Sequence, residues 1–174
     1  MIRSGLARLG VLALFAAAMG WLEAVVVVYL RALLGIAHAS SYPSDAEMLA
    51  RMNQLPWLLP TEQTREVATI LMLAAVAWLA APRIRGRVGA FLMAFGVWDV
   101  AYYGALRVLV DWPPRLSTMD LLFLIPPHPW WYQPVWVPVA ISGAMVMVGA
   151  WLFLADRGAP ARPKARRAPA PPGQ

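Results

Sequence analysis

The chain contains no cysteine, only two histidines and few charged residues. Of its 174 residues, 60% are hydrophobic and 14% are charged, whereas soluble domains carry about 25% charged residues. The absence of cysteine excludes disulfides, thiolate metal sites and cysteine nucleophiles. Both histidines, His38 and His128, lie outside the long apolar runs, so a haem held by histidines inside a membrane is not expected. No cofactor is evident from this composition.

The chain is rich in long hydrophobic runs, and these predict an all-α membrane protein. A helix needs about 20 apolar residues to cross about 30 Å of hydrocarbon. Four runs meet or approach this length, near residues 9–34, 65–81, 88–110 and 135–155. The first run begins like a cleaved signal peptide but continues to Leu34, which favours a retained span.

Positively charged residues gather on one side of the predicted spans. They lie before the first span, in the turn at 82–87 and after the fourth span. Because cytoplasmic loops are enriched in Lys and Arg, the sequence predicts a bacterial inner-membrane protein with both termini in the cytoplasm. The single domain over 1–157 precedes a basic, Pro/Ala-rich tail at 158–174, for which we expect disorder.

The net charge of +6 follows this topology pattern and does not indicate nucleic-acid binding. The expected partner is the lipid bilayer. A chain of four spans is small for a transporter, so a homodimer or a larger membrane complex is also compatible with the sequence.

Two acids stand out because each is the only acid inside its apolar run. Glu23 and Asp99 lie near the middle of the first and third runs. A carboxyl group at the bilayer centre costs roughly 2.5–3.5 kcal/mol on insertion scales, so such residues usually serve a function. A structural hydrogen bond between helices is the alternative.

The surroundings of the two acids match and indicate an internal duplication. Gly20, Glu23 and Arg31 recur 76 positions later as Gly, Asp and Arg; beyond the first loop the offset becomes 73. The halves, about 9–82 and 88–156, would each contain a span, a short interfacial helix and a second span. Ser-x-x-acid sequences at 44–47 and 117–120 resemble the capping boxes that begin helices. Chance similarity between hydrophobic helices is the competing interpretation.

The polar residues near the outer ends of the spans predict a pocket for a substrate or ion. Its candidate residues are Glu23, Asp99, Glu66, Arg31, Arg107, Tyr103 and Asp120. Some have a simpler interpretation: the two arginines can extend to the membrane surface, and Glu66 can complement a helix dipole. The tryptophans and tyrosines of the second loop are typical of an interfacial belt.

Three segments carry a family resemblance. They are Trp-Asp-Val-Ala-Tyr-Tyr at 98–103, Asp-Leu-Leu-Phe-Leu-Ile-Pro at 120–126 and Pro-Trp at 129–130. The chain thereby resembles a group of small uncharacterised bacterial integral membrane proteins with four helices. The resemblance implies a fold and no activity.

Three functions remain open from the sequence. The buried acids could bind a proton or cation in a small carrier or channel component. They could instead act as general acid and base in a membrane enzyme with a lipid or apolar substrate, or bind Mg²⁺ or Mn²⁺ through Glu23, Glu66 and Asp99. The third hypothesis is a non-catalytic subunit whose acids pair with arginines.

Overall fold

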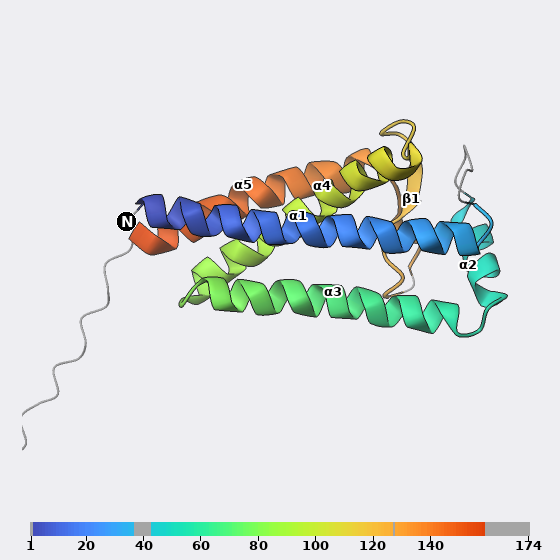
Figure 1. Cartoon of the computed structure of the whole chain (residues 1–174), viewed down its shortest axis with the longest axis horizontal. Helices are drawn as coiled ribbons and strands as arrows, with labels where there is room; N and C mark the ends of the chain where they lie inside the picture. Colours follow the sequence, from blue (N-terminus) through green and yellow to red (C-terminus); the bar gives the residue numbers. More distant parts are fainter. Residues whose placement is uncertain (1, 37–42, 127, 159–174) are drawn as a thin grey trace, which may run out of the picture.

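The fold is helical, as the composition predicts (Figure 1). The computed structural model describes residues 2–36, 43–126 and 128–158; His38 and the tail beyond residue 158 lie outside them. The elements in chain order are α1 (Ile2–Leu33), α2 (Asp45–Asn53), α3 (Leu58–Ala80), α4 (Ile84–Val110), β1 (Met119–Leu121), the 3₁₀ turn η1 (Pro129–Trp131), β2 (Tyr132–Pro134) and α5 (Trp136–Gly158).

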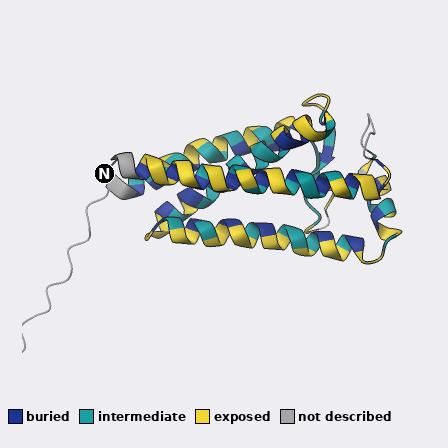
Figure 2. Ribbon diagram, in the orientation of Figure 1, coloured by how far each residue is buried: buried dark blue, intermediate teal, exposed yellow. Residues whose placement is uncertain are grey.

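Three helices are long and apolar enough to cross a membrane. They are α1 over Gly5–Leu33, α4 over Ile84–Val110 and α5 over Trp136–Asp156. Figure 2 shows that exposed residues recur along the long helices, and many of these residues are large and apolar, as lipid contact would require. Helix α3 has 23 residues, about 34 Å of helix, but its first nine residues carry three charges.

The four long helices run lengthwise between two ends of the molecule (Figure 1). Helices α1 and α4 begin at the same end and run in the same direction, and α3 and α5 return. We call the end with the start of α1 the termini end and the end with α2 and the β-strands the loop end.

The first loop forms the short helix that the capping box predicts. The Ser44 hydroxyl accepts a hydrogen bond from the backbone N–H of Glu47 at 3.3 Å. The apolar side of α2 then packs through Met48 and Met52 against the ends of α1 and α3.

The prediction of a matching helix in the second loop is wrong. Residues Met119–Leu121 form strand β1, which pairs antiparallel with β2. Prolines at 126, 127 and 129 leave only about eight residues for a helix that starts near Ser117, and so short a helix is marginal. Strand pairing satisfies the backbone instead and turns Asp120 toward the interior.

Helix α4 is the central helix, because glycines bring its neighbours close on two sides. Gly20 of α1 lies against the backbone of Trp98 in α4, and Gly96 of α4 lies against the backbone of Ser142 in α5. Helix α4 packs extensively on α1 and α5 and less on α3, and α1 touches α3 at few points. Helix α3 is therefore the least closely packed of the four long helices.

Two glycines of α5 provide a test of this packing. A Cβ at Gly149 would lie 2.5 Å from the backbone nitrogen of Met93, whereas a Cβ at Gly143 meets nothing within 4 Å. Because alanine is favoured over glycine in a helix by about 1 kcal/mol, Gly143→Ala should raise the melting temperature in detergent. Gly149→Ala should lower it, because backbone must move apart. Equal shifts would contradict the close α4–α5 contact.

Candidate functional site

A partly open cavity of about 220 Å³ lies near the middle of the bundle, toward the loop end. Residues of α1, α3, α4 and α5 line it, together with residues of α2 and of the second loop at the loop end. Toward the termini end, a core that includes Ala16, Leu73 and Met93 follows it. Its polar lining consists of Glu23, Glu62, Arg65, Glu66, Thr69, Asp99, Tyr102, Tyr103, Asp120 and Ser142.

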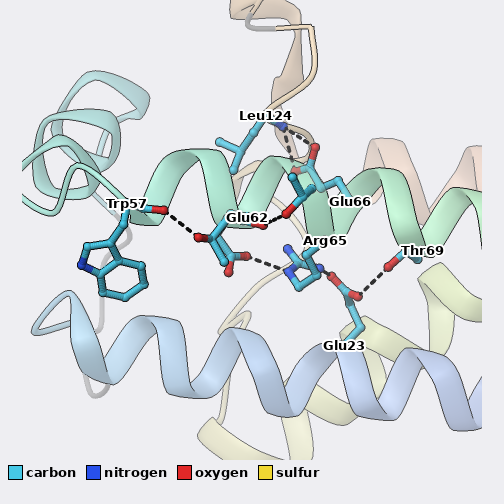
Figure 3. A network of polar contacts seen from close by, with 9 residues as sticks. Glu23, Trp57, Glu62, Arg65, Glu66, Thr69 and Leu124 are labelled. Atoms are coloured by element: carbon cyan, nitrogen blue, oxygen red, sulfur yellow. Dashed lines mark hydrogen bonds and ion pairs between the residues drawn. The ribbon is translucent and has the colours of Figure 1, made fainter.

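Arg65 is the centre of a polar cluster in the first half of the chain (Figure 3). Its guanidinium forms ion pairs with Glu23 of α1 and with Glu62 one turn earlier in α3, the latter at 2.7 Å. Thr69 also donates a hydrogen bond to Glu23 at 3.3 Å. One cation thus lies between two carboxylates, and Glu23 joins α1 to α3.

Asp99 has a different environment on the opposite wall. The Ser142 hydroxyl of α5 donates to its carboxylate at 2.7 Å. No lysine, arginine or histidine among the described residues forms an ion pair with it. Glu23 and Asp99 therefore line one cavity, but each bonds to a different helix, and of the two only Glu23 has an ion-pair partner among the described residues.

Asp120 is buried in the second loop, with 4% of its surface exposed. Tyr103 of α4 donates its phenol proton to it at 2.8 Å. Burial raises the pKa of Asp120 to about 6, and the Asp99 carboxylate adds to this increase. The Tyr103 and Leu121 hydrogen bonds and the Arg31 charge oppose it.

Glu66 holds the second loop over the cavity. Both of its carboxylate oxygens accept the backbone N–H of Leu124, at 2.9 and 3.0 Å (Figure 3). Gln63 donates to the carbonyl of the same residue at 3.4 Å. Glu66 therefore does more than complement the dipole of α3: it fastens the loop to that helix.

The two arginines predicted for the site do not line the cavity. Arg31 is 2% exposed, so it does not extend to the surface; its guanidinium lies 5.0 Å from the centre of the Trp112 ring. Arg107 has a half-exposed side chain and donates to the Asp111 carbonyl at 2.7 Å. The charge of Arg31 does act on Asp120, whereas the position of Arg107 does not support its prediction as a site residue.

Five predicted residues thus meet at the cavity: Glu23, Glu66, Asp99, Tyr103 and Asp120. In the described part of the chain no group of three His, Cys, Asp or Glu side chains is placed to hold a metal ion, so Glu23, Glu66 and Asp99 do not form the metal site considered above. Sequence reasoning missed Glu62, Thr69 and Ser142, which also line the cavity. Thr69 and Ser142 are 73 positions apart. This is the offset of the duplication beyond the first loop, so the duplication could have identified both residues.

Comparisons with protein families, with curated proteins and with solved structures give no significant match. The chemistry of the site therefore has to be argued from its own residues.

Removal of the Arg65 charge should destabilise the bundle. Arg65→Gln leaves two largely buried carboxylates without a cation. Breaking a buried pair in this way costs about 3–5 kcal/mol. Because Arg65 is partly exposed, we expect a loss at or below the lower end of that range. Arg107→Gln is the matched control, because both partners of that pair are exposed and about 0.5 kcal/mol is expected. Unfolding in mixed detergent micelles measures both. Similar losses in the two variants would contradict the Arg65 cluster.

Asp120→Asn should change how stability depends on pH. The folded chain holds the Asp120 proton more tightly than the unfolded chain, so wild-type stability falls as the pH rises from 3.8 through about 6. Asparagine does not titrate and can still accept the Tyr103 hydrogen bond. The melting temperature of Asp120→Asn minus that of wild type should therefore increase as the pH rises through this range. A difference that is constant with pH would show that Asp120 ionises normally.

Proposed function

We propose that the protein is a small proton- or cation-coupled carrier, or a component of one, and that the central cavity is its binding site. The observation that carries this proposal is Asp99, a carboxyl at mid-bundle that lines a cavity and has no fixed counterion in the described residues. Such a group can bind either a proton or a cationic ligand. Because the two cannot bind at once, binding of the ligand is coupled to release of the proton.

The proposal includes four membrane spans, with α3 as the second. The charges of α3 lie toward the loop end, and its last fourteen residues, 67–80, carry none. Glu62 and Arg65 neutralise each other in part, so the span does not bring three uncompensated charges into lipid. The loop end then faces outward and the basic turn at 82–87 faces the cytoplasm, as the positive-inside rule requires.

Side chains at the basic turn support this placement. Arg87 lies over the ring of Trp78 at 3.4 Å, and Arg85 lies 5.1 Å from that of Trp151. Tryptophan and arginine are typical of the boundary between hydrocarbon and lipid headgroups. The inner ends of α3 and α5 would therefore lie at one depth.

The internal duplication is also part of the proposal. Glu23 bonds Thr69, 46 positions away, and Asp99 bonds Ser142, 43 positions away. The offset of 76 takes Glu23 to Asp99, and the offset of 73 takes Thr69 to Ser142. An acid and a hydroxyl on consecutive spans therefore meet in each half, and parallel repeats related by an axis along the membrane normal occur in other carriers.

A membrane enzyme remains the second candidate, and the covered cavity favours it. The Glu66–Leu124 contact holds a loop over a mostly apolar pocket that contains a Tyr103–Asp120 hydrogen bond. A carboxyl and a phenol are suited to proton transfer to or from an apolar substrate. A purely structural subunit is the least favoured, because such a role does not require a cavity beside Asp99.

Access to the cavity distinguishes carrier from enzyme. The natural chain lacks cysteine, so a single Ile70→Cys variant places one thiol in the cavity lining. In oriented vesicles we expect membrane-impermeant thiol reagents to label it from either face, because a carrier alternates between two openings. The unmodified chain gives the background.

The outcomes separate the candidates clearly. Labelling from the loop end alone would overturn the carrier and favour the enzyme. No labelling from either face would also overturn the carrier and keep the enzyme, because a lipid or apolar substrate can reach a cavity that is closed to aqueous solutes. Circular dichroism and gel filtration of the Ile70→Cys variant establish that the reagent meets folded protein.

A further inference from the structure

The acid–hydroxyl cluster of the first half contains a cation, whereas among the described residues the corresponding cluster at Asp99 has none. Arg65 pairs with Glu23, and the position 73 residues after Arg65 is Pro138. Pro138 also lines the cavity. The acid and the hydroxyl are thus present in both halves, while the cation that completes the first cluster is replaced in the second by a residue without charge.

The space beside Asp99 is too large for a bare metal ion. A water molecule needs roughly 10–15 Å³ of such volume, and the cavity offers about 220 Å³. Hard metal ions also require several oxygen ligands, and no three acids in the described chain are grouped for that purpose. An occupant of molecular size fits this space better.

The lining indicates an apolar body. Phe95, Trp98 and Tyr102 form an aromatic row on α4, with ring centroids 5.3 and 6.4 Å apart. Phe123 of the second loop stacks on Phe95 and contacts Trp131 at 5.1 Å. All five rings line the cavity. Aromatic faces attract cations as well as apolar groups, so this wall and Asp99 favour the same class of ligand.

We propose that the cavity binds an organic cation, a protonated amine or guanidinium on an apolar body. Its cationic group would take beside Asp99 the place that the Arg65 guanidinium takes beside Glu23, and its body would lie along the aromatic row. The inference rests on the proposed carrier function and duplication, and it specifies the substrate class for that site.

Benzylammonium and phenylguanidinium are suitable probes, with neutral benzyl alcohol as the control. Calorimetry on the full chain in lipid nanodiscs should detect saturable binding of the two cations with a Kd of about 1 mM or tighter, a modest demand for ligands of this size. Benzyl alcohol should bind more weakly. No binding of either cation, or equal binding of the alcohol, would overturn the proposal.

Two variants test the place of the cation. Asp99→Asn removes the charge without changing the shape and should weaken cation binding by roughly thirty-fold or more. Pro138→Arg supplies a built-in cation and should compete with the probes, whereas Val108→Arg, which adds a cation at an exposed position of α4 outside the cavity lining, should bind them as wild type does. Pro138 lies in the first turn of α5, where it contributes no helical hydrogen bond, so arginine fits the helix there.

Unchanged binding in Asp99→Asn and Pro138→Arg would place the cation elsewhere and overturn the inference. The result is independent of the labelling experiment. Cation binding together with labelling from one face only would overturn the carrier proposal and support the cation site. Labelling from both faces without cation binding would support the carrier proposal and overturn this substrate class.

Discussion

The ion pair between Glu23 and Arg65 is the interaction on which the site depends. Helix α3 packs mainly on α4 and contacts α1 at few points, so its direct connection to α1 beside the cavity is the polar one made by Glu23 with Arg65 and Thr69. The guanidinium extends from α3 to Glu23 while it also binds Glu62, and charges in surroundings of low dielectric are costly unless they are paired. This pair holds α3 beside α1 at a separation that leaves room for a cavity.

The other half of the bundle is built by the opposite means. Helices α4 and α5 approach so closely that glycines are required at their contact, and small residues are the usual means of helix association in lipid. The closely packed α1–α4–α5 unit presents Asp99 and the aromatic row, whereas α3 and the second loop complete the cavity through polar contacts such as Glu66 with Leu124.

The sequence was a good guide to the helices and to part of the site. Apolar runs predicted the long helices to within several residues, and the cost of a buried charge identified Glu23 and Asp99 before any contact was known. The second loop shows where pattern reasoning fails. Ser117 and Asp120 have capping-box spacing, but the prolines that follow shorten the segment, and strand pairing with 132–134 satisfies its backbone instead. Capping signals are local, whereas strand pairing depends on a distant partner.

By itself the sequence determined that the chain is helical and apolar, that two acids lie inside helical runs, and that the halves resemble each other in spacing. These properties follow from hydropathy and helical periodicity, which are local. Only the tertiary structure decided which acid has a counterion: Arg65 reaches Glu23, Arg107 turns to the surface, and Arg31 is buried against Trp112. The partner of a long charged side chain is set by which helices pack together, and that depends on contacts between residues far apart in the chain.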